Sequence, residues 1–257
     1  MLYFFAFLFG LIIGSLLNCI IYRLEEGKSF LFGRSYCPHC KHNLSWQDLI
    51  PAFSFIALRG KCRYCQKPIS FQYPLVEMAT GLIFVLIFSF QFSAATFYWL
   101  ISACFLIIIF VFDLKHYIIP DKVIFPAILI SAIWYTIALI FLDIYSWQEV
   151  LKAFFSAFGA AAFFLLLVLI SKGKWMGIGD IKLAFFMGLL TGWPNILVAL
   201  ILAYFIGAIV GIALIFLKKK SLKAEVPFGP FLVAGTFIAL FWGEKIIYWY
   251  LTFFLIK

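Results

Sequence analysis

Long apolar runs separated by short polar segments divide this chain, and the pattern limits the folds that it can adopt. Several runs reach the length of about 20 residues that an α-helix needs to cross a hydrocarbon core about 30 Å thick. Hydrophobic residues make up 66% of the chain and charged residues 12%, which leaves too little polar surface to cover a water-soluble globule. The sequence therefore predicts an all-α, polytopic helical membrane protein.

Eight apolar segments are expected to form transmembrane helices. They cover roughly residues 2–21, 74–91, 96–112, 122–142, 151–171, 181–192, 195–217 and 229–243. The sixth is short for a bilayer and follows a glycine-rich stretch, so part of it is expected to lie against protein instead of lipid. The tail 246–256 is about half a span long, which favours an interfacial or packed helix over another crossing.

The positions of the basic residues predict the orientation of these helices. No Lys or Arg precedes the first run and Arg23 follows it, which predicts an uncleaved anchor with its N-terminus outside. Alternate threading then places segments 22–73, 113–121, 172–180 and 218–228 in the cytoplasm. Of the 20 Lys and Arg residues, only Lys152, Lys245 and Lys257 fall clearly outside. The net charge of +9 is explained by this topology and does not require a nucleic-acid partner.

One soluble insertion, residues 25–71, carries two close cysteine pairs. Cys37 and Cys40 form the first pair, and Cys62 and Cys65 form the second. Two such pairs can close a tetrahedral zinc site, although segment 41–61 is slightly longer than the usual separation of about 15 to 20 residues. Disulfides are the alternative, but they are rare in a reducing cytoplasm. Four thiolates leave no open coordination position, which predicts a structural zinc ion.

Two histidines of the insertion are alternative metal ligands. His39 and His42 could each replace a cysteine, but the four available sulfur atoms make this the minor option.

Three acidic residues lie at the cytoplasmic ends of predicted spans, where ionisable groups are costly and commonly functional. Asp113 ends the third span, where the helix dipole disfavours a carboxylate. Asp180 opens the sixth span, where an N-cap role is an ordinary structural alternative. Glu77 lies near the start of the second span and could be a simple interfacial carboxylate.

Asp113 and Asp180 are expected at the same depth on facing helices, which suggests a catalytic pair. Two carboxyl groups that share a site can divide the roles of aspartic-protease catalysis, one activating water and the other supplying a proton. Lys182 is not expected to neutralise Asp180, because residues two apart on a helix point to different faces. Asp121 is interpreted as the N-cap of the fourth span, and Lys115 and His116 as cytoplasmic anchors.

Several ordered motifs resemble those of the bacterial type IV prepilin peptidases, which are intramembrane aspartyl proteases. The resemblance is carried by Gly14-Ser15-Leu16-Leu17-Asn18, Ile21-Tyr22-Arg23-Leu24, the cysteine pairs, Tyr73-Pro74-Leu75-Val76-Glu77, Asp113 with Ile119-Pro120-Asp121, Gly177-Ile178-Gly179-Asp180-Ile181-Lys182-Leu183 and Pro227-Phe228-Gly229-Pro230. It covers roughly residues 10–235. Two positions depart from the family pattern, Glu25 for a common Pro and Leu49 for a common Asn, and both affect the insertion or its border.

The resemblance implies an inner-membrane enzyme whose active site faces the cytoplasm. Such an enzyme cuts the basic leader from type IV prepilins or type II secretion pseudopilins and then methylates the new N-terminus with S-adenosylmethionine. The catalytic pair would be Asp113 and Asp180. Cofactor-binding residues would be Glu77, Asn18, Tyr22 and Arg23. The implied division of the chain is a first helix at 1–23, a zinc-binding domain with a methyltransferase role at 24–73 and a peptidase domain at 74–257.

Two other functions are possible from the residues alone. A transporter with a zinc-stabilised cytoplasmic domain should carry acidic residues at several membrane depths, whereas the acidic residues of interest here cluster at the cytoplasmic boundary. A presenilin-type peptidase should lack the cysteine-rich insertion and should carry a Pro-Ala-Leu element, which is absent from the last span.

Overall fold

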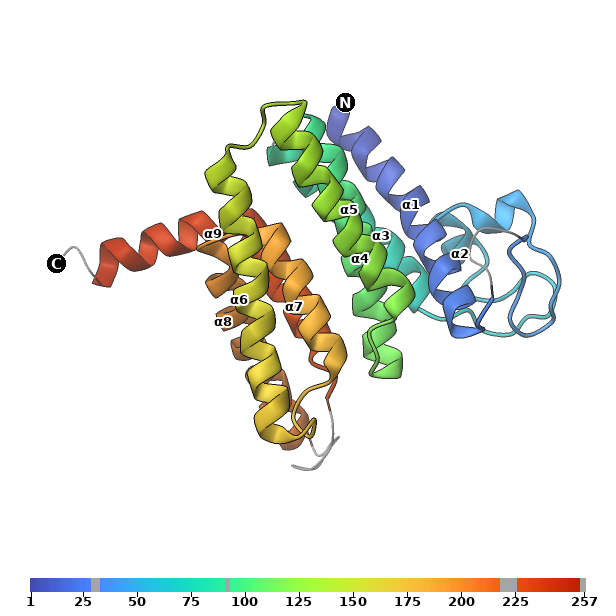
Figure 1. Cartoon of the computed structure of the whole chain (residues 1–257). Coiled ribbons are helices and arrows are strands. Elements are labelled where there is room, and N and C mark those ends of the chain that lie inside the picture. Colours follow the sequence, from blue (N-terminus) through green and yellow to red (C-terminus); the bar gives the residue numbers. More distant parts are fainter. Residues whose placement is uncertain (29–32, 91–92, 218–225, 255–257) are drawn as a thin grey trace. The chain divides into compact units, whose positions relative to one another are not determined.

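The computed structural model describes residues 1–28, 33–90, 93–217 and 226–254. Within these ranges the fold is helical, and two isolated bridges are the only β-structure. Seven helices are long and apolar enough to cross a membrane (Figure 1): α1 Leu2–Glu25, α3 Gln72–Phe90, α4 Ala94–His116, α5 Asp121–Ile140, α6 Trp147–Ser171, α8 Asn195–Phe216 and α9 Gly229–Phe254. These helices confirm the prediction of a polytopic helical membrane protein.

The predicted sixth span is a shorter helix, α7 Ile178–Thr191, with 14 residues. A helix of this length extends about 21 Å, which is too short to cross the hydrocarbon core by itself. Most of its apolar side chains are fully buried, including Leu183, Phe186 and Met187. The described residues therefore contain seven long helices and one short helix packed inside protein, as expected from the short length of the sixth predicted segment.

The chain divides into two compact units, Met1–Ile108 and Ile109–Lys257, and the division falls within α4. The first unit is built on the packing of α1 against α3. Glycine makes this close approach possible, because a Cβ atom at Gly10 would lie 2.7 Å from the Cα atom of Gly81, and one at Gly14 would lie 2.6 Å from the Cα atom of Glu77. Small residues at such contacts are typical of helix pairs in membranes.

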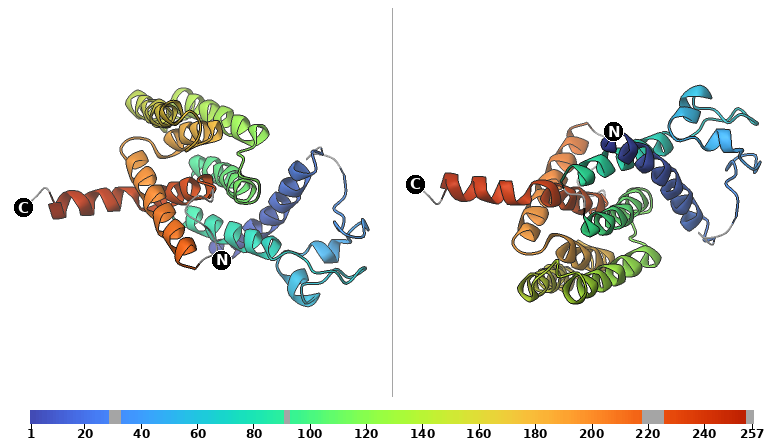
Figure 2. Two further views of the ribbon diagram at one scale, coloured as in Figure 1. Left: turned by 90° about the horizontal axis from the view of Figure 1, so that it is seen from below. Right: turned by 90° about the horizontal axis from the view of Figure 1, so that it is seen from above.

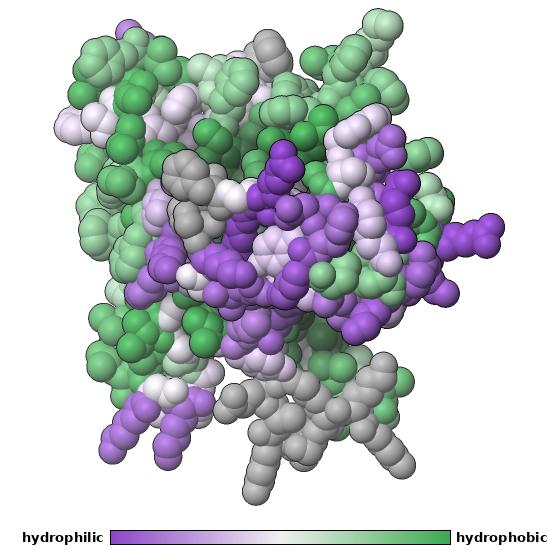
Figure 3. Space-filling model, turned by 90° about the vertical axis from the view of Figure 1, so that its right-hand side faces the viewer, coloured by the Kyte–Doolittle hydropathy of each residue, from purple (hydrophilic) through white to green (hydrophobic). Residues whose placement is uncertain are grey.

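The cysteine-rich insertion joins the end of α1 to the start of α3 (Figure 2). It contains two short helices, η1 Trp46–Leu49 and α2 Phe53–Ala57. Its hydrophilic side chains form a broad patch on the molecular surface, in contrast to the hydrophobic side chains of the long helices (Figure 3). The insertion is thus the part of the first unit with the most hydrophilic surface.

In the second unit, α7 packs against α5, α6, α8 and α9. A glycine again allows a close approach, since a Cβ atom at Gly188 would lie 2.4 Å from the Cα atom of Ala157 on α6. Tyr135 on α5 donates a hydrogen bond to the carbonyl oxygen of Leu189 at 2.6 Å, which also joins α5 to α7. The short helix is therefore the centre of this unit.

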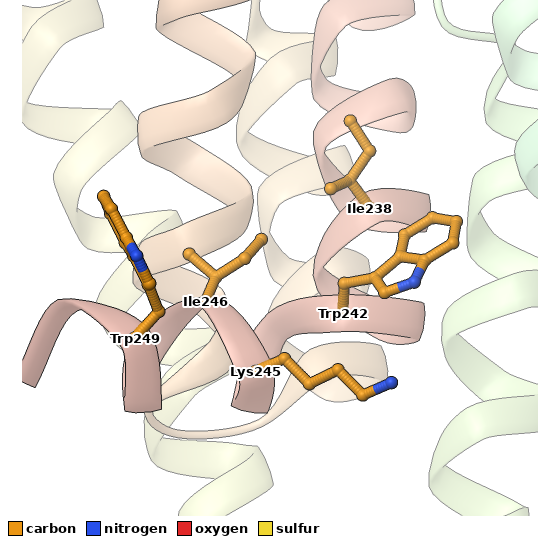
Figure 4. Close-up of a pocket in the computed structure, with 5 residues that line it drawn as sticks. All are labelled: Ile238, Trp242, Lys245, Ile246 and Trp249. Carbon is orange, nitrogen blue, oxygen red and sulfur yellow. The ribbon is translucent and has the colours of Figure 1, made fainter. Parts of the chain in front are cut away.

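The last predicted span and the tail as far as Phe254 form one continuous helix, α9. Its ribbon first runs along the bundle and then changes direction near Trp242 (Figures 1 and 4). A groove of about 370 Å³ lies at this turn and is lined by Ile238, Trp242, Lys245, Ile246 and Trp249. Tyr248 and Trp249 are 72% and 61% exposed, which suits the aromatic zone of a membrane surface.

Candidate active site and metal centre

Asp113 and Asp180 lie in the second unit although 66 residues separate them in the sequence. Asp113 is in the last turn of α4 and Asp180 is in the first turn of α7. Their side chains are 5% and 9% exposed, and the two carboxyl groups are close enough for their charges to interact. The structure therefore brings together two buried acidic groups, as expected from the sequence.

Each carboxyl group accepts a hydrogen bond from the backbone of a glycine. The N–H of Gly229, at the start of α9, donates to Asp113. The N–H of Gly177 donates to an Asp180 oxygen at 3.1 Å. Among the described residues, no Lys or Arg side chain lies within 4.0 Å of either carboxylate. Within the described part of the chain, no ion pair thus explains the two acids as structural charges.

The helix starts near these acids differ from the predicted ones. Gly177 is the N-cap of α7, so Asp180 is the third helical residue, and its side chain reaches back to the N-cap N–H. Pro120 is the N-cap of α5, and Asp121 is the first helical residue. The N-cap interpretations of Asp180 and Asp121 were therefore wrong. A carboxylate in the first turn is still favoured, because the backbone N–H groups point toward it.

Lys182 interacts with Asp121 and not with Asp180. Its ammonium donates to an Asp121 oxygen at 2.6 Å and lies 4.9 Å from the ring centre of Phe125. Next to this pair, a Cβ atom at Gly179 would lie 3.1 Å from the side chain of Ile119. These contacts hold the start of α7 against the segment that joins α4 to α5.

The four cysteines of the insertion form one cluster. Their Sγ atoms all lie within 4.8 Å of one another, and those of Cys37 and Cys65 are 3.8 Å apart. Zn–S bonds of about 2.3 Å in a tetrahedron require sulfur atoms about 3.8 Å apart, so the arrangement fits a zinc ion. None of the four is in a disulfide. The histidines are not part of the cluster, and the ring of His42 lies 3.7 Å from that of Tyr64.

The two halves of the cluster have the same local backbone. Cys37 donates from its N–H to the His42 carbonyl at 3.0 Å, and Cys62 donates to the Lys67 carbonyl at 2.9 Å. The residue after each pair, Lys41 or Gln66, has a positive φ of 58°. Each pair is therefore a tight knuckle, which is the local structure that the sequence spacing predicts.

A buried carboxylate links the second knuckle to η1. Asp48, whose side chain is 3% exposed, accepts hydrogen bonds from Ser45, from Arg63 Nε at 2.8 Å and from Tyr64 at 3.1 Å. Burial alone would raise the pKa of Asp48, but the hydrogen bonds from Ser45, Arg63 and Tyr64 outweigh burial and lower it below its ordinary value. Asp48 therefore remains ionised and ties the two parts of the insertion together.

The four residues that the family resemblance implies in cofactor binding belong to the first unit and lie near the insertion. Glu77 is 7% exposed and accepts a hydrogen bond from the N–H of Ala52 at 2.7 Å. Asn18 is 2% exposed and donates to the Tyr73 carbonyl at 3.0 Å. These two residues join α1, α3 and the insertion.

The other two implied residues, Tyr22 and Arg23, lie in the last turns of α1. Tyr22 donates to Glu26, and Arg23 donates to the Gly33 carbonyl at 2.6 Å. Both side chains thus fix the path of the chain into the insertion.

Two contacts of the acidic residues were not predicted. The N–H that approaches Glu77 belongs to Ala52, whose φ is 57°, and the N–H that approaches Asp113 belongs to Gly229. The motif containing Gly229 was noted in the sequence, but no role was assigned to it. Its only sequence signal was a glycine between an aromatic residue and a proline at the predicted start of a span.

Comparison with known proteins gives two family matches. Residues 8–91 match the bacterial peptidase A24 N-terminal domain, and residues 100–212 match the type IV leader peptidase family. No solved structure matches the chain.

Curated relatives align along nearly the whole chain. The prepilin leader peptidase/N-methyltransferase of Aeromonas hydrophila is 34% identical over 97% of this chain and 94% of the relative. Proteins of the same name from Legionella pneumophila and Bacillus subtilis (strain 168) are 34% and 32% identical, over 95% of this chain and 92% and 96% of the relatives.

Proposed function

The chain belongs to the type IV leader peptidase family, and we propose that it removes the leader from prepilins with Asp113 and Asp180 as its catalytic pair. The proposal rests on one observation above all. Two buried carboxyl groups from distant parts of the chain interact, and each accepts a hydrogen bond from a backbone N–H. Burial of charges without ion pairs is costly and is common at functional sites.

The arrangement supports amide hydrolysis by two acids. Two neighbouring carboxylates repel each other, so the pair holds one proton between them in the resting state. The ionised carboxylate accepts a proton from water as the water attacks the scissile carbonyl carbon. The protonated carboxyl group donates its proton to the carbonyl oxygen, and the resulting tetrahedral intermediate then collapses with protonation of the leaving amine. No covalent enzyme intermediate is required.

The substrates that fit this chemistry are prepilins and type II secretion pseudopilins. These substrates have a basic leader followed by a hydrophobic segment, as the family resemblance implies. A site at the ends of membrane helices, where α4 finishes and α7 begins, suits cleavage at the border between such a leader and a membrane segment. The relatives' names support prepilins as substrates.

We also propose that the first unit methylates the new N-terminus with S-adenosylmethionine. The relatives' names support N-methylation, and Glu77, Asn18, Tyr22 and Arg23 are the candidate residues for this activity. The donor would supply a methyl group from a positively charged sulfonium. Glu77 is a buried carboxylate beside the insertion, so its charge is complementary to such a donor.

A zinc ion in the cysteine cluster would serve a structural role. The four sulfur atoms fill a tetrahedral shell, so a bound metal has no open position for substrate or water. Among the described residues of the insertion, the buried apolar ones are the ligands Cys37 and Cys62. Metal binding would therefore hold the insertion in its folded form.

The orientation that best fits the charges places both sites at the cytoplasmic face of the inner membrane. Lys115, Lys172, Lys174 and Lys182 lie at the Asp113 and Asp180 end of the second unit. Residues 218–225, which were also predicted to be cytoplasmic, lie outside the described residues. An excess of lysine and arginine on one side marks the cytoplasmic side.

One assay tests the proposed function directly. Purified enzyme is incubated with a prepilin and labelled S-adenosylmethionine, and the peptide mass and the methyl incorporation are both read. Asp113→Asn and Asp180→Asn should each stop cleavage but still methylate a pilin that was cut beforehand. Normal cleavage by either folded variant would refute the aspartyl mechanism.

A further inference from the structure

The first residue of α9 packs directly on the carboxyl group of Asp113. A Cβ atom at Gly229 would lie 2.5 Å from the Oδ2 atom and 3.0 Å from the Cγ atom of Asp113. Real side chains do not approach so closely, so the present position of the carboxyl group requires a glycine. Gly229 is buried, and it donates its N–H to the same carboxyl group.

The local sequence makes this N–H available. The N–H groups of Phe231 and Leu232 both donate to the carbonyl oxygen of Phe228, at 3.0 and 3.2 Å, and Pro230 has no N–H. The N–H of Gly229 is therefore the free backbone donor of the first turn, and Asp113 accepts it. The start of α9 also carries the positive end of the helix dipole, which offsets the unfavourable position of Asp113 at the end of α4.

Aromatic packing fixes the backbone just before Gly229. The ring of Phe228 lies 5.1 Å from that of Tyr204 on α8 and 6.3 Å from that of Phe164 on α6. These contacts anchor the start of α9 to two other helices. Because Phe228 is held in this way, Gly229 cannot move away from Asp113 without disturbing that packing.

We propose that Gly229 is a positioning residue for leader cleavage. Its missing side chain leaves room for the Asp113 carboxyl group, and its N–H fixes the direction of that group toward Asp180. The inference depends on the proposed role of Asp113. Gly229 sets the position of the Asp113 carboxyl group and does not itself contact the substrate.

Gly229→Ala is the main test. The added Cβ atom must displace the carboxyl group or the start of α9, and a shift of about 1 Å in a catalytic group can reduce the rate about 100-fold. We expect kcat for prepilin cleavage to fall by at least about tenfold while KM changes less than about twofold. Methylation of a previously cut pilin, measured on the same preparation, should be retained.

A matched variant on the same helix separates this effect from general damage. A Cβ atom at Gly235 would lie 2.3 Å from the Ala199 carbonyl oxygen, far along α9 from its first residue. Gly235→Ala should lower thermal stability, and its loss of kcat should follow its loss of folded protein. Gly229→Ala should instead lose kcat in protein that remains folded. A wild-type kcat for folded Gly229→Ala would overturn the inference.

A double-mutant cycle covers the case in which Gly229→Ala does not fold. Asp113→Ala removes the Oδ2 and Cγ atoms. The Cβ atom that remains at position 113 lies 3.4 Å from the Cβ atom added at position 229, which is an ordinary contact. Gly229→Ala should then be tolerated in the Asp113→Ala background, as measured by thermal unfolding. Equal destabilisation in both backgrounds would refute the contact. Activity of Asp113→Asn would refute the proposed function itself, whereas an inactive Asp113→Asn with a fully active Gly229→Ala would refute only the role of Gly229.

Discussion

The Lys182 ammonium is paired with Asp121, 2.6 Å away, and not with Asp180, two residues earlier in the chain. The pair joins the fifth residue of α7 to the first residue of α5. Its side chains are 26% and 60% exposed, so solvent screens much of the attraction. The contact therefore contributes more to the placement of α7 than to the stability of the protein.

Lys182→Met should consequently reduce kcat for prepilin cleavage more than it reduces the stability of the folded protein. A pair this exposed is worth at most about 1 kcal/mol, so thermal unfolding should change little. Removing the link lets the start of α7 shift, and we expect kcat to fall by about three- to tenfold, within the range that misplacement of a catalytic group produces. Asp121→Asn should give the same result, and the double variant should be no worse than either single one. Additive losses would show that the residues act separately.

Zinc content should depend on the four cysteines of the cluster and on no others. Metal analysis of the wild-type protein should give one zinc ion per chain. Cys62→Ser should lose the metal and expose the insertion to trypsin, because the folding of such small domains depends on the metal. Cys104→Ser, in α4, is the control and should keep the zinc ion. Full zinc occupancy in Cys62→Ser would contradict the proposed ligands.

Asp48→Asn should destabilise the insertion by about 1 to 3 kcal/mol, because a buried charged acceptor with several hydrogen bonds is replaced. The pKa of Asp48 is lower in the folded protein than its ordinary value. Its contribution is therefore fully present above pH about 4 and is lost as the pH falls through the folded-state pKa. Urea-induced zinc release should show the same defect at pH 7 and pH 5. A defect that disappears at pH 5 would contradict this assignment, and Glu244→Gln, an exposed acid on α9, serves as the control.

Glu77→Gln should reduce methyl transfer more than cleavage. Glutamine can still accept the hydrogen bond from Ala52, so the local fold should persist while the negative charge is lost. Methyl incorporation into a pre-cut pilin and cleavage of a prepilin are measured on the same preparation. Asp180→Asn should show the opposite pattern. Equal loss of both activities in Glu77→Gln would make the residue structural.

Single engineered cysteines test the orientation of the second unit. In a background without Cys19 and Cys104, Lys115→Cys and Lys174→Cys should resist a membrane-impermeant maleimide in intact cells and react after lysis. Gln148→Cys, at the start of α6, lies at the opposite end of the unit and should react in intact cells. Labelling of position 174 from outside would reverse the proposed topology.

The helices were predictable because their signal is local. A run of about 20 apolar residues is sufficient evidence for a span, and each long helix lies where such a run occurs. Helix ends were less predictable, since the N-caps of α5 and α7 are Pro120 and Gly177 and not the aspartates that follow. In both cases the aspartate correctly indicated a helix start, but the predicted N-cap lies one residue (α5) or three residues (α7) after the observed one.

The pairing of residues across the fold was only partly predictable. The expected approach of Asp113 and Asp180 followed from their equal depth, and the failure of Lys182 to pair with Asp180 followed from helix geometry. The partner of Lys182 is 61 residues away, and the position of Gly229 depends on how α9 packs. Neither contact leaves a periodic pattern in the sequence, because both are set by tertiary packing.

The short length of α7 has a consequence for the supply of water to a hydrolytic site. Its 14 residues extend about 21 Å, which is about 9 Å less than the hydrocarbon core. The non-helical backbone beyond such a helix must be solvated by water or covered by protein, since lipid cannot satisfy its N–H and C=O groups. With the proposed orientation, the glycine-rich backbone before α7, beside Asp180, therefore requires water or protein around it instead of lipid. Water at that position would reach a peptide bond without crossing the hydrocarbon core.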